Sequence, residues 1–222
     1  MAEAIDGAQI SAAVRRAADY MVTLRDTLNQ LDAAVGDGDL GITAFKGASA
    51  MREYLSENPP GDDLGTFLAG LGMAFNRAAS STMGALTATA LMRAGKEARG
   101  MAQLDTGAIV RMLSAADVGI QERGKASPGD KTIVDALHPA AQAFSAAIDG
   151  GQSLDAAAQE MLQAARRGRD SVIPARSKVG RASWVGERTE NQPDPGTVLL
   201  VSVMEAVLGA EHTEAGSTLG HV

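Results

Sequence analysis

The 222-residue chain has no cysteine, so disulfide bonds, thiolate zinc sites and cysteine nucleophiles are all excluded. Aromatic residues are also scarce, at 3% of the sequence. A core must therefore be built mainly from Ala, Leu, Val, Ile and Met. These side chains suit closely packed helices better than sheets, which favour β-branched and aromatic residues. The composition favours a helical protein.

The chain also lacks a net positive charge and long apolar runs. The formal net charge of −7 argues against a protein that coats nucleic acid, because phosphate neutralisation needs clustered Lys and Arg. It does not argue against binding a phosphate compound through a metal ion. No apolar run approaches the roughly 20 residues needed to span a bilayer, and the N-terminus lacks the pattern of a signal peptide. We expect no nucleic-acid partner, no membrane partner and a cytoplasmic location.

Apolar residues recur at steps of three and four, which is the spacing of amphipathic helices. The first such stripe runs from Ile10 to Leu31. Further helices are predicted for residues 42–55, 64–79, 85–99, 106–123, 131–148, 154–172 and 196–210. Residues suited to capping a helix N-terminus precede four of them: Asp105, Asp130, Ser153 and Asp194. About eight helices with mostly short loops predict an all-α, single-domain fold over residues 1–222, with mostly antiparallel neighbours.

One connection, residues 174–193, is too long for this pattern. It is polar, basic at its start, and contains the only tryptophan of the chain, Trp184. Arg181 and Arg188 offer guanidinium groups that could bind phosphate. Long irregular loops inside compact domains are usually functional or disordered. We expect a functional loop, and its sequence alone fits a flexible lid and a partner-binding loop equally well.

The run LDAAVGDGDLGIT, residues 31–43, places three carboxylates close together. Asp32 lies near the end of the first predicted helix, where the helix dipole disfavours an anion. Asp37 and Asp39 add repulsion, which an oxygen-ligated Mg²⁺ would reverse. The two glycines between them permit a tight backbone path, and the spacing does not match an EF-hand. We predict a metal site here; the alternative is a solvated acidic turn.

Two further loops are ambiguous on their own. In residues 80–96, small residues lead straight into a helix, where exposed N–H groups can hold phosphate oxygens, although such residues are also common helix caps. In residues 122–137, a Pro-Gly turn is followed by the cation Lys131. That loop does not meet the P-loop spacing, and an ordinary helix–turn–helix joint explains it as well.

Together, the four loops resemble the L subunit of dihydroxyacetone kinase, the nucleotide-binding subunit of that enzyme. The matching sequences, in order between Asp32 and Gly196, are DAAVGDGDLG, TMGAL, GKASPGDKTIVDAL and GRASWVGERTENQPDPG. The resemblance implies a barrel of eight antiparallel helices with ATP or ADP among the loops at one end. It also implies Mg²⁺, with two ions expected, between the phosphates and three aspartates.

Residue by residue, the resemblance assigns the metal ligands to Asp32, Asp37 and Asp39. It places the phosphates along Leu40, Gly41, Ile42 and Thr43, and along Thr82, Met83 and Gly84. Gly124 and Ile133 would line the adenine side and Arg181 would contact the nucleotide. Asp194, Pro195 and Gly196 would close over it.

Two positions depart from the family pattern. Leu40 stands where the family usually has His, and Met83 stands where its Gly-Gly-x-Ser-Gly loop has Ser. The loss of that hydroxyl leaves backbone N–H groups to bind phosphate. These departures suggest a subfamily that acts on another short ketose, such as erythrulose.

In the family, the ketose is bound covalently by a histidine of a separate K subunit. This chain has three histidines: His138, within a predicted helix, and His212 and His221, in a tail expected to be flexible. None has the context of a ketone-binding nucleophile, so we expect half of a kinase active site that needs a K-type partner.

The resemblance leaves the phosphoryl donor and further partners open. The donor is either exchangeable ATP, which the two departures slightly favour, or a bound ADP that a phosphotransferase-system protein rephosphorylates. A regulatory nucleotide-binding module that signals to a transcription regulator is the alternative function. A homodimer is compatible with the sequence.

Overall fold

Residues 4–216 are described by this computed structural model, and nearly all of their regular secondary structure is helical, which confirms the all-α prediction. The helices are α1 (Gly7–Thr23), α2 (Arg25–Val35), α3 (Leu40–Glu57), α4 (Leu64–Ala78), α5 (Thr82–Glu97), α6 (Thr106–Gly124), α7 (Val134–Asp149), α8 (Leu154–Ser171), the 3-10 helix η1 (Arg181–Thr189) and α9 (Pro195–Leu208). Two short strands that the sequence did not predict, β1 (Ala4–Asp6) and β2 (Gln103–Asp105), pair antiparallel.

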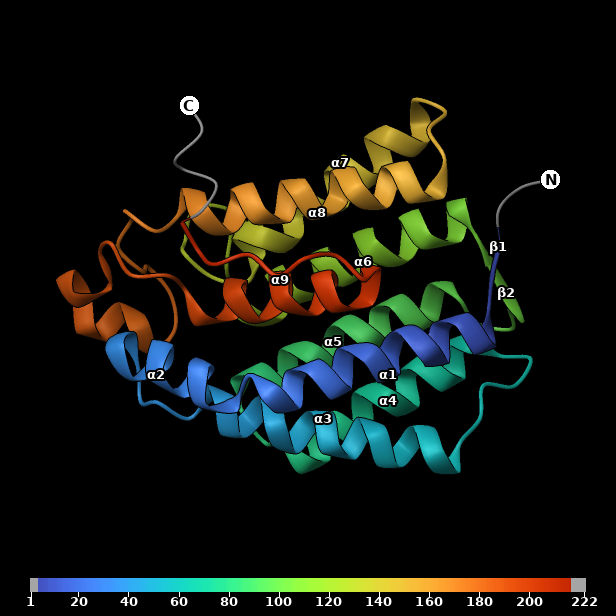
Figure 1. Ribbon diagram of the computed structural model, residues 1–222, viewed down its shortest axis with the longest axis horizontal. Helices are drawn as coiled ribbons and strands as arrows, with labels where there is room; N and C mark the ends of the chain where they lie inside the picture. Colours follow the sequence, from blue (N-terminus) through green and yellow to red (C-terminus); the bar gives the residue numbers. More distant parts are fainter. Residues whose placement is uncertain (1–3, 217–222) are drawn as a thin grey trace.

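Eight helices form a closed ring. Going round it, α1 contacts α3, and α4, α5, α6, α7, α8 and α9 follow in turn until α9 contacts α1 again. Successive members run in opposite directions along the long axis of the molecule (Figure 1). This is the expected antiparallel barrel. The loops that precede α3, α5, α7 and α9 all lie at one end, on the left in Figure 1, where α2 and η1 pack against each other.

The first predicted helix is divided at Leu24, so the prediction of one continuous helix is wrong. The Thr23 hydroxyl donates to the Tyr20 carbonyl, 2.7 Å away, and competes with the backbone ladder. The Leu24 N–H bonds the carbonyl of Met21, only three residues back. The apolar stripe continues across this break, which is why periodicity did not reveal it.

Three of the four predicted caps are confirmed. The side chains of Asp105, Ser153 and Asp194 each accept a backbone N–H at the start of the next helix. The prediction for Asp130 is wrong, because α7 begins three residues later than a helix capped there would.

The late start of α7 has a local cause. Lys131 has a left-handed backbone conformation, with φ of 60°, which an α-helix cannot contain. The Asp135 carboxylate accepts the N–H groups of Gly129 and Thr132 and stabilises the turn. The Asp130 carboxylate instead accepts the N–H of Ser127, 2.8 Å away.

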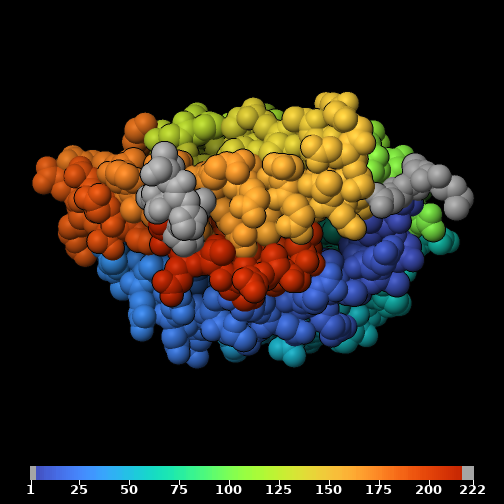
Figure 2. Space-filling view, turned by 45° about the horizontal axis from the view of Figure 1, so that its top comes forward, coloured from blue at the N-terminus to red at the C-terminus, as the bar shows by residue number. Residues whose placement is uncertain are grey.

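The prediction that residues 174–193 form an irregular loop is only partly right, because η1 occupies nine of these residues. In the space-filling view, η1 and its neighbours project at the end of the barrel (Figure 2).

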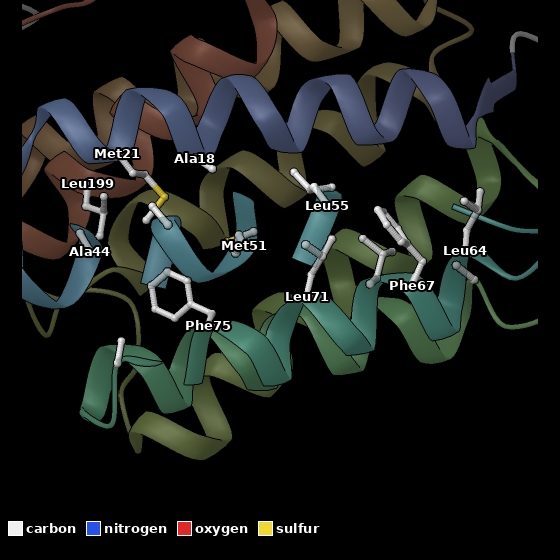
Figure 3. Close-up of a cluster of buried hydrophobic side chains, with 14 of the residues drawn as sticks. Ala18, Met21, Ala44, Met51, Leu55, Leu64, Phe67, Leu71, Phe75 and Leu199 are labelled. Atoms are coloured by element: carbon white, nitrogen blue, oxygen red, sulfur yellow. The ribbon is translucent and has the colours of Figure 1, made fainter. Parts of the chain in front are cut away.

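The core is made mainly of small and flexible apolar side chains, as the composition predicted. Its largest cluster fills the space between α1, α3, α4 and α9 (Figure 3). Met21, Ala44 and Leu199 meet near the end of the barrel that carries the loops, and Phe75 packs beside them. Leu40, at the start of α3, belongs to this cluster. None of the described helices is both long and apolar enough to cross a membrane.

Candidate functional site

The loops at this end of the barrel enclose a cavity of about 220 Å³. It brings together most of the residues predicted from the sequence: Asp32, Asp37, Asp39, Leu40, Thr43, Thr82, Met83, Ile133, Arg181, Asp194, Pro195 and Gly196. These residues come from the end of α2, from the loops before α3, α7 and α9, from the first turns of α3, α5 and α9, and from the start of η1. Segments as far apart in sequence as residues 32 and 196 therefore share one cavity.

Four predicted residues do not line this cavity: Gly41, Ile42, Gly84 and Gly124. Gly41 packs on the backbone of α2, where an added Cβ would lie 1.8 Å from the Arg25 carbonyl oxygen. The Ile42 N–H donates to the Asn29 side chain. Gly84 directly follows Met83 in the first turn of α5, and Gly124 ends α6. Contact between these four residues and a nucleotide stays a prediction.

The acidic loop folds back on the end of α2. One carboxylate oxygen of Asp32 accepts the N–H groups of Asp39, at 2.9 Å, and of Leu40, at 3.2 Å. This return path needs both intervening glycines. A Cβ on Gly36 would lie 2.7 Å from the Asp32 carboxylate, and Gly38 has φ of 78°, which side chains disfavour. The backbone thus fixes the orientation of Asp32.

The three carboxylates converge as predicted. Each of Asp32, Asp37 and Asp39 contributes an oxygen, and these oxygens lie within 4.8 Å of one another. Asp37 and Asp39 are exposed, so their side chains can adjust by small rotations. Hard oxygen donors in an open site fit Mg²⁺, which prefers carboxylates and phosphates at about 2.0–2.1 Å. The donor set therefore suits the predicted metal.

The segment that contains η1 forms the opposite wall of the cavity. Arg181 contacts the Asp37 carboxylate directly. Arg188 donates to the Ala34 carbonyl near the end of α2, at 3.3 Å. η1 is thus attached to the acidic loop at two points, and the half-exposed Arg181 guanidinium lies where it can reach an anion in the cavity.

The N-terminus of α5 forms a third wall. Ser81 caps this helix, and its hydroxyl accepts the N–H of Gly84 at 3.1 Å. The first N–H groups of a helix have no intrahelical acceptor and carry partial positive charge. Thr82 and Met83, in that first turn, therefore face the cavity with a dipole suited to phosphate.

The two departures from the family pattern have a structural explanation. Leu40 and Met83 both line the cavity, and both also pack against the main core cluster. Each side chain closes the barrel interior beneath the cavity. Neither brings a hydrogen-bonding side-chain group to it.

The Asp194 carboxylate both caps α9 and faces the cavity. It accepts the Thr197 N–H at 2.7 Å. Burial raises the pKa of Asp194 to about 7, against the opposing effect of that hydrogen bond, and the nearby Asp135 carboxylate adds to the rise. The nearby Lys131 ammonium lowers it. The charge on this wall therefore changes near neutral pH.

Several cavity residues were not predicted. They are Val35, Gly36, Ser81, Leu86, Lys131, Thr132, Val179, Gly180 and Ala182. Most are apolar or small and reach the cavity only because the ring closes, which no local pattern shows. Lys131 was noted as a loop cation, but the structure buries it to 2% exposure, and lysine is rarely buried.

The described histidines lie outside the cavity. His138 pairs with Asp117 through Nδ1 at 2.7 Å. His212 lies 3.2 Å from the Glu205 carboxylate and stacks on Tyr20, so the expectation that it lies in a flexible tail is wrong. His221 lies outside the described residues.

Comparison with known proteins agrees with this geometry. Residues 34–209 match the family model of the DAK2 domain. The chain belongs to the DAK2 domain family. The resemblance to the L subunit of dihydroxyacetone kinase is thereby confirmed.

Three relatives illustrate the range of this family. The chain is 30% identical to L-erythrulose kinase of Pectobacterium atrosepticum over 96% of its own length but only 36% of that protein. It is 28% identical to the ADP-binding subunit of the PEP-dependent dihydroxyacetone kinase of Escherichia coli, over 86% of its own length and 90% of the subunit. The dihydroxyacetone kinase of C. freundii in its native form has the same fold, with a TM-score of 0.72, 26% identity, and coverage of 95% of this chain and 36% of that one.

Proposed function

We propose that this chain is the nucleotide-binding half of a kinase that transfers phosphate to a short ketose. Asp32, Asp37 and Asp39 would hold two Mg²⁺ ions on the phosphates of ATP. The ketose, of three or four carbons, would be bound by a K-type partner subunit, and the reaction would take place in the cytoplasm.

The convergence of three carboxylates beside a helix N-terminus carries this proposal. Like charges at Asp32, Asp37 and Asp39 repel one another unless a cation lies between them. The α5 N-terminus, in contrast, attracts an anion. A cavity with both features fits a metal–phosphate ligand better than a free cation or a free anion. The name of the E. coli subunit, an ADP-binding protein, supports the same ligand.

The residues of this chain supply positioning and charge neutralisation. Backbone N–H groups at Thr82 and Met83 would hold phosphate oxygens, and Arg181 would leave Asp37 to contact the nucleotide. Bound Mg²⁺ neutralises phosphate charge and aligns the transferring group. Phosphoryl transfer needs little covalent chemistry from the protein, which agrees with a cavity lined by no cysteine, histidine or tyrosine among the described residues.

The partner is proposed from what the site lacks. Within residues 4–216, both histidines are paired with carboxylates away from the cavity, so neither is placed to bind a ketone there. The chain also spans only 36% of the erythrulose kinase that it matches. The missing part of the site would come from the K-type subunit.

The test is a reconstitution. The purified chain is incubated with ATP, Mg²⁺ and either dihydroxyacetone or erythrulose, with and without a K-type subunit. We expect ketose phosphate only in the mixture. Phosphorylation by this chain alone would contradict the half-site. Turnover only with a phosphotransferase-system donor would replace ATP by bound ADP, and no turnover with intact nucleotide binding would favour the regulatory module.

A further inference from the structure

Lys131 is a buried cation that the chemistry above does not use. Its side chain is only 2% exposed, although it belongs to a loop that lines the cavity. The ammonium donates three hydrogen bonds, to the carbonyl oxygens of Ile173 at 2.8 Å, Ala175 at 2.8 Å and Thr189 at 2.5 Å. An ammonium group has three donors, so none remains for a phosphate.

The three carbonyls lie at the two ends of one segment. Ile173 and Ala175 precede η1, and Thr189 is its last residue. Lys131 therefore ties both ends of the segment to the loop between α6 and α7. The segment between these ties carries Arg181, which contacts Asp37 in the cavity.

Further bonds reinforce the same junction. The Thr189 hydroxyl accepts the Ser177 N–H at 3.0 Å, which joins the two ends of the segment to each other. The Lys178 N–H donates to the Asp130 carbonyl at 3.1 Å. Each of these bonds joins two parts of the chain. The Lys131 ammonium joins three, because it links the loop between α6 and α7 to both ends of residues 173–189.

The arrangement is costly, which argues that it is needed. Burying a charge is unfavourable compared with leaving it in water, and burial lowers the pKa of Lys131 even though the nearby Asp194 and Glu190 carboxylates oppose that effect. The left-handed backbone of Lys131, with φ of 60°, adds strain, because a residue other than glycine disfavours this conformation. This conformation keeps Lys131 out of α7, which begins at Val134. The Lys131 side chain instead reaches residues 173–189.

We propose that Lys131 is a positioning residue of the nucleotide site. Its three hydrogen bonds attach both ends of residues 173–189 to the loop between α6 and α7, and this attachment holds Arg181 at the cavity. The effect on nucleotide binding rests on the proposed function. The attachment of residues 173–189 by Lys131 does not.

The attachment of residues 173–189 by Lys131 can be tested without any ligand. Trp184 is the only tryptophan, lies in η1 and is 87% exposed, so its fluorescence reports on this segment alone. Time-resolved anisotropy of Trp184 is compared in the unaltered chain, in Lys131→Met and in the control Lys178→Met. Lys178 is in the same segment, but its ammonium is exposed and 3.7 Å from Asp130. We expect faster Trp184 motion only in Lys131→Met; unchanged motion would overturn the proposal.

The effect on the site is measured as affinity for Mg²⁺–ADP by calorimetry. We expect Lys131→Met to weaken binding between about tenfold and about a hundredfold, as small displacements of binding groups do, and Lys178→Met to leave it unchanged. No binding by the unaltered chain would contradict the proposed function. The anisotropy result would still show whether Lys131 attaches residues 173–189.

A double-mutant cycle separates positioning from general support of the fold. If Lys131 acts through Arg181, Lys131→Met should weaken binding little further in an Arg181→Ala background. Additive losses would overturn the positioning role. If circular dichroism shows that Lys131→Met does not fold, Lys131→Gln, which keeps amide donors, is used in the same cycle with the same criteria.

Discussion

Two clusters of charged residues in this molecule differ in how their charges are balanced. The first joins α8, α9 and residues 209–216, and both signs are present and buried. Arg169 and Asp170 are each 1% exposed and pair at 2.7 Å. The Glu205 carboxylate, also buried, pairs with Arg166 at 2.9 Å. Figure 2 shows α9 and the following residues between α8 and α1, closing the ring.

The second cluster is the acidic loop, where one sign dominates. Asp32, Asp37 and Asp39 converge at the cavity, and Asp37 is paired with the exposed guanidinium of Arg181. The buried cluster has its charges balanced within the protein, so it serves the fold. The acidic cluster is short of positive charge and open to solvent, so it is the one suited to a ligand. The balance of charge, more than the number of charged residues, distinguishes a site from a structural element.

Removing one partner of the buried cluster should have the largest effect. Arg169→Met leaves the Asp170 carboxylate buried without its guanidinium, and it also removes hydrogen bonds to the Thr213 and Glu214 carbonyls. We expect a loss of about 3–5 kcal/mol in the free energy of unfolding, measured by urea denaturation. Arg52→Met, which breaks an exposed pair with Asp19, is the control and should change stability little. Equal effects of the two variants would refute the distinction.

Removing one charge of the acidic cluster should give the opposite pattern. Asp37→Asn keeps the shape of the side chain but relieves repulsion, so we expect unfolding stability to be unchanged or slightly higher. Affinity for Mg²⁺–ADP should fall at least about tenfold, or about 1.4 kcal/mol, in calorimetric titrations. Unchanged affinity would remove Asp37 from the metal site.

Asp194 lies between the two cases, because it is mostly buried and has no paired guanidinium. Its pKa is raised from 3.8 to about 7 in the folded protein, so the folded state retains this proton at pH values where the unfolded state has lost it. The stabilisation from that proton is fully present below about pH 4 and is lost as the pH rises towards 7.

The change should be visible against Asp194→Asn, whose amide does not titrate. Because part of the carboxyl group is open to the cavity and so to solvent, we expect the unaltered chain to lose only about 1–2 kcal/mol relative to this variant between about pH 4 and pH 7. Urea denaturation at several pH values measures it. A constant difference across this range would show that the pKa of Asp194 is not raised.

The smallest effect is expected at a neutral group. Ser81→Ala removes the acceptor of the Gly84 N–H at the start of α5, and loss of such a cap costs about 1 kcal/mol of stability. Ser114→Ala, at an exposed position within α6, is the matched control in thermal denaturation. A Ser81 variant as stable as its control would mean that the hydroxyl does not cap the helix.

The sequence predicted the parts of this molecule that depend on local patterns. Helical periodicity identified the ring members, and the spacing of acidic residues and glycines identified the loop that contains Asp32. Properties set by distant contacts were not predictable. The closing contact between α1 and α9 is one, and the burial of Lys131 against carbonyls more than 40 residues away in sequence is another.

Local chemistry also misled where two interpretations were equally good. Asp130 is a suitable helix cap by type and position, but the Asp135 carboxylate accepts the Thr132 N–H, which would lie in the first turn of a helix capped there. The break at Leu24 coincides with a hydrogen bond from the Thr23 hydroxyl within an unbroken apolar stripe. In both places side-chain hydrogen bonds accompany a change in the backbone that the sequence pattern does not show.

Metal dependence of nucleotide binding tests the central claim most directly. ADP is titrated into the purified chain by calorimetry, first with Mg²⁺ and then after removal of divalent ions with EDTA. Because the acidic cluster repels phosphate unless cations lie between them, we predict binding with Mg²⁺ and none measurable without it. Equal affinity under the two conditions, or no binding under either, would contradict a metal–nucleotide site at Asp32, Asp37 and Asp39.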